Sequence, residues 1–194
     1  MRARDVMRLV PAALLLWAGA ALAGDSIFLV SRKDMPDPNF HDTVVLVTHL
    51  EGATVGLILN RPTRITLGEV FPEIEKNLRP GDRLNFGGPV SPEFVTYLVR
   101  SSVRPPESEE VAEGVYLASS PTLLQAILAG DAKVEAVRVF AGYAGWAPGQ
   151  VEGEVSRGDW NVLRADAKTI FDKNAEKLWP EMNRRASATT AMLR

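Results

Sequence analysis

Two runs of β-branched and apolar residues, 43–50 and 54–59, constrain the fold of this chain more than any other feature. Each run predicts a β-strand, and the short turn around Glu51 and Gly52 predicts that the two strands form an antiparallel hairpin. Because both runs are apolar at nearly every position instead of alternating, we expect both faces of the strands to be covered. The rest of the chain must therefore supply helices that pack on a sheet.

Two helices are indicated by their capping residues. Thr66, with Glu69 three residues later, has the pattern of a capping box, and Pro72 predicts the end of that first helix. A second helix is expected between Ser120, which can cap its start, and Gly130, which ends it.

Strands are expected before and after the second helix, at residues 115–118 and 134–140. Strand, helix, strand at this spacing predicts a crossover between parallel strands, whereas the first hairpin is antiparallel. The predicted fold class is therefore α/β (α+β), a single domain with a mixed β-sheet flanked by helices.

Shorter elements complete the domain, and no linker divides it. Strands are expected at 27–30, 83–86 and 94–99, and helices at 148–157 and within 166–179. An exposed loop rich in proline and glutamate is expected at 104–113, and fraying is expected from about Ala186 onward. We predict one domain over residues 24–182 and a flexible C-terminal tail over residues 183–194.

The beginning of the chain, residues 1–23, has the order of a secretory signal peptide. Three arginines precede an apolar run over residues 9–22, which ends in the small-x-small triplet at 21–23. A bilayer requires about 20 apolar residues, so the pattern favours cleavage before Gly24 over a membrane anchor. The mature protein is then periplasmic or secreted, with no membrane span. The alternative is a cytoplasmic protein whose true start lies further along the chain.

Charge and cysteine content exclude several classes of function. Cleavage would remove three arginines and one aspartate, which changes the formal net charge from −2 to −4. Sequence-independent binding of nucleic acid needs a basic face, so a nucleic-acid partner is not expected. The chain has no cysteine, which excludes disulfides, thiolate metal ligands and thiol catalysis.

A glycine-rich stretch, FAGYAGWAPGQVEGE at 140–154, is expected to be a loop between a strand and a helix. Gly142, Tyr143, Gly145 and Trp146 are candidate ligand-binding residues there, because such loops can hold an anion against helix amides. The glycine spacing matches neither the dinucleotide nor the phosphate-loop fingerprint. The alternative is a tight corner whose aromatic side chains pack on neighbouring loops.

The end of another strand can also be interpreted as either a ligand site or a structural feature, and its residues are Asn60, Arg61 and Thr63. Arginine offers paired donors suited to a carboxylate or phosphate. If this strand end and the glycine-rich loop lie on one side of the sheet with Gly87 and Gly88, the three would line a small polar cleft. In the structural alternative, Asn60 caps the strand end through a backbone hydrogen bond, and Arg61 pairs with an acid of the 152–154 segment.

The remaining polar residues favour structural interpretations. His41 and His49 offer two metal ligands, but no spacing nominates a third, so no metal site is predicted. Glu152 and Glu154 would face different sides of a helix, so they are poor partners for acid and base catalysis. Trp160 is expected in the core.

Four stretches together resemble the AlgH/YqgE family: DPNF at 37–40, VGLILNRPT at 55–63, FGGPV at 86–90 and GYAGWAPGQVEGEV at 142–155. They occur in the family's order. The resemblance implies a single α/β domain with a mixed sheet, and it brings no agreed catalytic residues. Members often carry a transcriptional-regulator label. This chain departs from most relatives in its signal peptide and in lacking a cysteine shortly before His49.

We therefore predict a non-enzymatic binding or accessory module in the periplasm, without a cofactor, that takes a small anion or a partner protein's chain end. One alternative is a metal-dependent hydrolase or nuclease-like enzyme that uses Asp42 and His49. The other is a cytoplasmic transcriptional regulator, if the signal peptide is misread.

Overall fold

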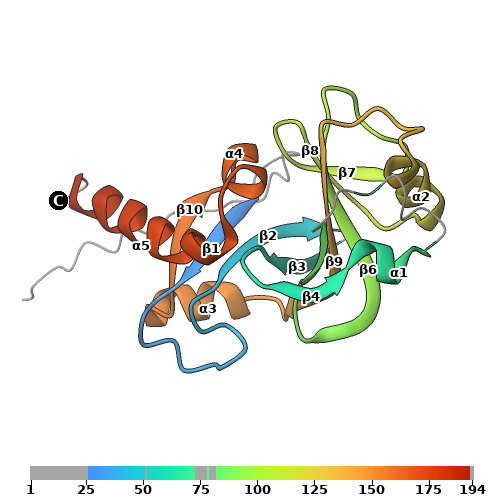
Figure 1. Ribbon diagram of the computed structural model, residues 1–194. Coiled ribbons are helices and arrows are strands. Elements are labelled where there is room, and N and C mark those ends of the chain that lie inside the picture. The colour runs from blue at the N-terminus through green and yellow to red at the C-terminus, as the bar shows by residue number, and fades with distance from the viewer. Residues whose placement is uncertain (1–25, 51, 73–77, 79–81, 193–194) are drawn as a thin grey trace, which may run out of the picture.

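A computed structural model describes residues 26–50, 52–72, 78 and 82–192 (Figure 1). Ten described strands form one curled sheet in the order β10-β1-β2-β3-β9-β6-β8-β7, with β4 and β5 beside that path. The strands are β1 (Ile27–Ser31), β2 (Val44–Leu50), β3 (Ala53–Ile58), β4 (Pro62–Thr66), β5 (Arg83–Phe86), β6 (Val90–Arg100), β7 (Ser108–Ala112), β8 (Val115–Ala118), β9 (Ala136–Trp146) and β10 (Trp160–Arg164).

The sheet is mixed, as the sequence predicts. The described strands pair antiparallel except for β5 and β9, which run parallel. The expected hairpin is β2–β3, with Val45 opposite Ile58 and Leu50 opposite Ala53. Its two faces contact different cores, since Leu46 lies in one and Val45 in another, which explains the continuous apolar runs.

Five helices are described: α1 (Leu67–Val70), α2 (Pro121–Ala129), α3 (Gln150–Arg157), α4 (Ala167–Phe171) and α5 (Ala175–Met192). The capping box of Thr66 and Glu69 starts α1, and the hydrogen bond from the Thr66 amide is the main cause of a lowered pKa for Glu69. Gly130 ends α2 in the left-handed conformation, whereas the Ser120 side chain makes no capping bond. Helix α2 joins β8 to β9, which are parallel to each other with β6 between them.

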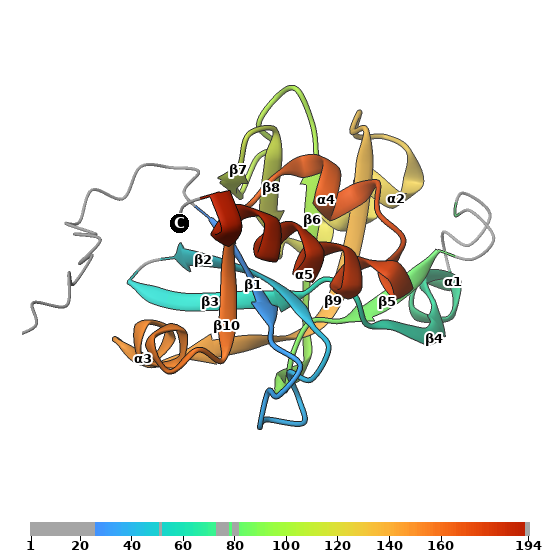
Figure 2. The same ribbon diagram turned by 90° about the vertical axis from the view of Figure 1, so that its left-hand side faces the viewer.

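Three hydrophobic cores hold the layers together. The inner core lies in the curl of the sheet and includes Phe28, Leu46 and Phe140. Helices α4 and α5 cover part of it, and Figure 2 shows α5 running across the front of the sheet. A second core packs α1 and α2 on β6, and a third packs α3 on β2 and β3.

The prediction of a loop at 104–113 is wrong over much of that segment, because the segment contains β7. Ser108 pairs with Ala118 and Ala112 with Val115, so the segment forms the edge strand beside β8. Its charged residues Glu109 and Glu110 gave it the composition of a loop, but an edge strand can carry charges on its exposed side.

Two further segments differ from the sequence predictions. Residues 186–192, expected to fray, are the last part of α5, and Ala186 is buried against the inner core. The loop expected after Phe140 is instead the second half of β9, which continues to Trp146.

The N-terminal segment, residues 1–23, lies outside the described residues, so the signal peptide stays a prediction. Among the helices that the structure describes, none combines the length and apolar character needed to cross a bilayer.

Candidate functional site

Gly142 marks an irregularity in the strand that the glycine-rich stretch forms. Its φ of +68° places it in the left-handed region, opposite a register shift in β6 between Val90 and Val95. The side-chain alternation of β9 changes at Gly142, so that Phe140 before it and Tyr143 after it both contact the inner core. One strand can therefore pair with β6 along its first part and with β3 at its end.

Gly87, Gly88 and Gly142 form a contact that we call the glycine seam. A Cβ atom on Gly87 would lie 2.2 Å from the Gly142 carbonyl oxygen, and one on Gly88 would lie 2.2 Å from the Tyr143 carbonyl carbon. The Gly87 amide also donates to the Ala141 carbonyl at 2.8 Å. The glycines let two backbones touch, and the contact leaves no space for a ligand between them.

The polar groups of Asn60, Arg61 and Thr63 are engaged within the protein. Asn60 donates to the Asp42 carbonyl at 2.8 Å and accepts from the Val44 amide at 2.9 Å. Asn60 therefore caps the strand end through backbone hydrogen bonds, which is the structural alternative given in the sequence analysis. Arg61 Nη2 donates to the His41 carbonyl at 2.9 Å, and Thr63 Oγ1 donates to the Leu84 carbonyl at 2.8 Å.

The Trp146 side chain is also engaged in contacts within the protein. Its indole Nε1 donates to Glu154 Oε2 at 3.0 Å, and Trp160 donates to the same oxygen at 2.9 Å. Phe40 stacks on Trp146 with ring centroids 5.9 Å apart. Glu154 therefore pairs with two buried indoles and not with Arg61, while Gly145 is exposed on the surface.

The histidines do not form a shared metal site. His41 Nδ1 lies 3.4 Å from Asp42 Oδ2 at the start of β2, and His49 Nδ1 lies 2.9 Å from Thr54 Oγ1 near its other end. An extended segment of this length separates Asp42 from His49 by roughly 20 Å, so the two cannot ligate one ion. In the part of the chain that the structure describes, no three His, Cys, Asp or Glu side chains form a group that could hold a metal.

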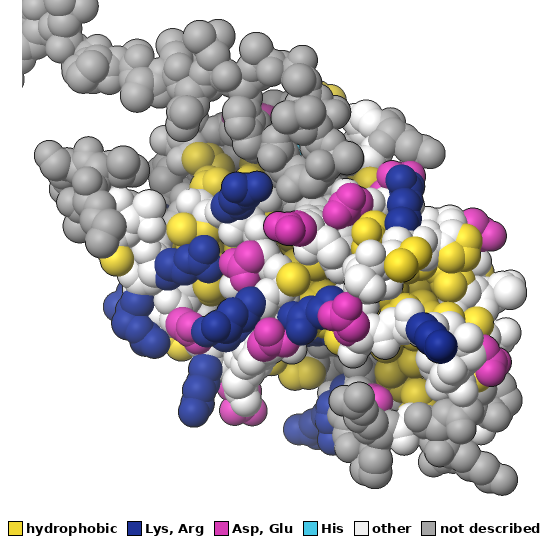
Figure 3. Space-filling view, turned by 90° about the horizontal axis from the view of Figure 1, so that it is seen from above, with side chains coloured by type: hydrophobic (Ala, Val, Ile, Leu, Met, Phe, Trp, Pro, Cys, Tyr) yellow, Lys and Arg dark blue, Asp and Glu magenta, His cyan; other side chains and the backbone are white. Residues whose placement is uncertain are grey.

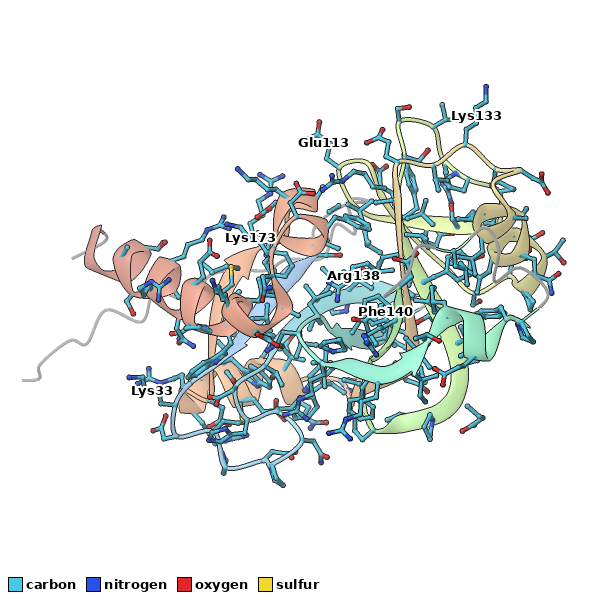
Figure 4. All side chains as sticks on the ribbon, viewed as in Figure 1. Lys33, Glu113, Lys133, Arg138, Phe140 and Lys173 are labelled. Atoms are coloured by element: carbon cyan, nitrogen blue, oxygen red, sulfur yellow. The ribbon has the colours of Figure 1, made fainter. Side chains whose placement is uncertain are left out.

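Arg138 fixes β9 to the elements around the inner core (Figure 4). Its guanidinium donates to the carbonyls of Ile170 and Leu59 at 2.8 and 2.6 Å, and to Asn85 Oδ1 at 2.8 Å. It also lies over the Phe140 ring, 5.3 Å from the centroid. Burial lowers the pKa of Arg138 to about 10, so it remains charged at neutral pH.

The curl of the sheet leaves a cavity of about 450 Å³, which we call the sheet cavity. Its lining residues are Leu46, Thr48 and Leu50 of β2, Val55, Gly56 and Leu57 of β3, Ser91, Glu93, Phe94 and Thr96 of β6, Val111 of β7, Leu117 of β8, and Tyr143 of β9. Cavities of this size hold small molecules in other proteins. Of the nine residues proposed from the sequence, Tyr143 alone lines it.

Thr96 gives the sheet cavity an unusual polar group. On β6, the flanking residues Val95 and Tyr97 contact the core beneath α2, so Thr96 points to the other face, into the cavity. The residue is 8% exposed, and its Oγ1 atom has no hydrogen-bond partner among the described residues. A buried hydroxyl without a partner costs about 1–3 kcal/mol, so a ligand that supplies one would relieve that cost.

The mouth of the cavity is aromatic. Phe94 is 47% exposed and packs edge-on against Tyr143, with ring centroids 6.4 Å apart. Ser91, three residues earlier, has a φ of +44° within the bulged part of β6. Strained bulges recur beside binding sites because they redirect side chains, as here toward the cavity.

A second space of about 370 Å³, which we call the side hollow, adjoins the sheet cavity. The two share Leu50, Phe94, Thr96 and Leu117 as lining residues. The side hollow is more polar, since Arg104, Glu107, Ser108, Glu109 and Ser119 also line it. The site is therefore an apolar chamber joined to a more polar one, with Thr96 at the junction.

A larger hollow of about 580 Å³ lies beside α5, and two of its lining side chains already donate hydrogen bonds within the protein. Trp179 Nε1 and Asn183 Nδ2 both donate to the Ser31 carbonyl, at 2.8 and 3.2 Å. Figure 3 shows basic and acidic side chains interleaved over the α5 half of the visible face, without a patch of one sign. This hollow offers no unpaired buried group to a ligand among the residues described.

Little in the sequence marks Thr96, Phe94 or Thr48 as site residues. Each lies in a segment predicted to be a strand, and period-two alternation is blurred there because both faces are partly apolar. Which strand face encloses a cavity depends on how far the sheet curls, and residues close in the chain do not specify that.

Comparisons of sequence agree over most of the described chain. The sequence model of a family described as AlgH-like matches residues 28–191. A UPF0301 protein of Paraburkholderia phytofirmans is 36% identical over 157 residues, which cover 77% of this chain and 81% of that relative. A UPF0301 protein of Anaeromyxobacter dehalogenans is 36% identical over 170 residues, which cover 81% and 85%.

Two solved structures resemble the fold. The crystal structure of a protein from Corynebacterium diphtheriae matches with a TM-score of 0.71 and 26% identity, over 84% of this chain and 86% of that one. The solution structure of the AlgH protein from Pseudomonas aeruginosa matches with a TM-score of 0.65 and 32% identity, over 87% of each chain.

Proposed function

This chain belongs to the AlgH-like family of UPF0301 proteins, and from its sheet cavity we propose that it is a non-enzymatic binding module for a small molecule with an apolar portion. The observation that carries the proposal is the unpaired Thr96 hydroxyl inside an otherwise largely apolar cavity. Binding sites typically combine apolar walls with a few polar groups that orient the ligand.

The residues lining the cavity favour binding over catalysis. Its titratable side chains are Glu93 and Tyr143, and Glu93 is exposed near the mouth. General acid and base catalysis requires a positioned proton donor or acceptor next to the reacting atom. Thr96 can orient a ligand, but among the described residues no base forms a hydrogen bond with its hydroxyl that would activate it as a nucleophile.

The proposal includes export to the periplasm. Its support is the order of basic, apolar and small residues over residues 1–23. Mass spectrometry of the protein recovered from periplasmic and cytoplasmic fractions tests this part. A mature chain beginning at Gly24 in the periplasm is expected, and a chain that retains Met1 in the cytoplasm would contradict export.

Binding can be tested with N-phenyl-1-naphthylamine, an uncharged apolar dye whose fluorescence rises in apolar surroundings. We expect saturable binding to the purified protein. Val55→Trp places an indole in the cavity wall and should abolish binding, whereas Val103→Trp, at a position that is 74% exposed, should not. Equal dye binding by a correctly folded Val55→Trp variant would refute the sheet cavity as the site.

A further inference from the structure

We propose that the ligand is a monoacyl ester: a straight hydrocarbon chain in the sheet cavity, an ester carbonyl at Thr96 and a polar head in the side hollow. This inference rests on the proposed function and names the ligand class of the same site. It follows from two properties of the site: the change in polarity along it, and the unpaired hydroxyl at the junction.

The polarity of the two spaces fixes the direction of the ligand. Leu46, Leu57 and Val111 line the inner end of the sheet cavity and belong to the inner core. Arg104 and Glu107 line the side hollow, where Arg104 Nη2 lies 3.2 Å from Glu109 Oε2. Since acids and a base share the side hollow, a neutral polar head fits it better than a strongly charged one.

The walls favour a hydrocarbon chain over a peptide. Each peptide residue would bring an amide and a carbonyl that need partners, and unpaired groups are costly in an apolar space. The hydroxyls that line the sheet cavity are those of Thr48, Ser91, Thr96 and Tyr143, too few for an extended backbone. A hydrocarbon chain needs no hydrogen bonds along its length.

The hydroxyl of Thr96 favours an ester over an amide or an acid. A threonine hydroxyl can donate one hydrogen bond, and an ester carbonyl accepts it without adding a donor. An amide would bring an N–H group, and an ionised acid would bring a charge, at a point where Leu50, Phe94 and Leu117 surround the junction.

The experiment measures displacement of N-phenyl-1-naphthylamine by monooctanoyl-, monodecanoyl- and monolauroylglycerol below their aggregation limits. Each step adds two methylenes, so affinity should rise about tenfold per step while the chain still fits. The matched alkyl glycerol ethers have the same head and chain but no carbonyl. They should bind about tenfold more weakly, because Thr96 then stays unpaired.

Thr96→Val tests the role of the hydroxyl directly, because valine keeps the shape of threonine. We expect the preference for ester over ether to fall to about one in this variant, while Thr96→Ser, which keeps a hydroxyl, retains a preference for the ester. Circular dichroism and thermal melting confirm that both variants fold. A similar ester preference in wild type and Thr96→Val would overturn the assignment of Thr96.

The outcomes separate this inference from the proposed function. Dye binding that is blocked by Val55→Trp but not displaced by any glyceride would keep the binding function and overturn the ester as ligand. Equal affinities of ester and ether for the wild-type protein would overturn it as well. If the dye does not bind at all, both proposals fail.

Discussion

The glycine seam and the sheet cavity meet at adjacent residues of β9, Gly142 and Tyr143, yet they differ in how tightly they are packed. In the seam, backbones touch and a single added Cβ atom would collide with main-chain atoms. In the cavity, ordinary strand side chains leave about 450 Å³ of space. Gly87, Gly88 and Gly142 therefore mark a tight backbone contact, while the space for a ligand lies beside it.

The largest loss of stability is expected from a substitution that disrupts the glycine seam. In Gly142→Ala, the new Cβ would lie 2.5 Å from the Gly88 carbonyl oxygen at a residue whose φ is +68°. The free energy of unfolding should fall by about 3 kcal/mol, measured by urea denaturation. The control is Gly145→Ala, whose Cβ has its nearest contact at 3.6 Å, and it should stay within about 0.5 kcal/mol of wild type. Similar losses in both variants would contradict the seam.

The next largest effect is expected when Arg138, the cation that bonds β9 to neighbouring elements, is replaced. Arg138→Met leaves the Leu59 and Ile170 carbonyls and Asn85 Oδ1 without their donor, so unfolding should cost about 2 kcal/mol less. Arg64→Met, at an exposed side chain, is the control and should have little effect. Chemical denaturation at neutral pH measures both. If the free energy of unfolding does not fall in Arg138→Met, the cost of desolvating the guanidinium offsets the free energy of its hydrogen bonds.

Replacing Thr96 in the sheet cavity should have a smaller effect on stability, and of the opposite sign. Without ligand, Thr96→Val removes an unpaired buried hydroxyl and should stabilise the protein by about 1 kcal/mol. Thr169→Val is the matched control, since Thr169 Oγ1 donates to Asp166 Oδ2 at 2.9 Å and its loss should destabilise by a similar amount. Calorimetric melting distinguishes the two signs. Destabilisation by Thr96→Val would show that its hydroxyl has a partner.

The smallest expected effect concerns Arg61, the cation first considered for an anion site. Its side chain donates to one carbonyl in an exposed setting, so Arg61→Ala should change stability by about 0.5 kcal/mol or less. It should also leave the affinity for the apolar dye unchanged in a fluorescence titration. A clear loss of affinity would extend the ligand site from the cavity to the strand end at Asn60.

Much of the fold could be predicted from local patterns. The capping box at Thr66, the glycine that ends α2 at Gly130 and the β2–β3 hairpin all depend on residues close in the chain. Strand β7 could not, because its pairing with β8 outweighs a loop-like composition. Nor could the role of Gly142, since the same φ serves a turn or a bulge and only the partner strand selects one.

Residue types at short spacing are enough to indicate most of the strands, the helix caps and the family, and they also predict an export signal. Contacts between distant segments settle that Gly87, Gly88 and Gly142 touch, that Asn60 and Arg61 bond within the protein, and that Thr96 faces a cavity. The physical reason is that a cavity is the space left when distant strands curl around one another. No short segment of the chain specifies how far they curl.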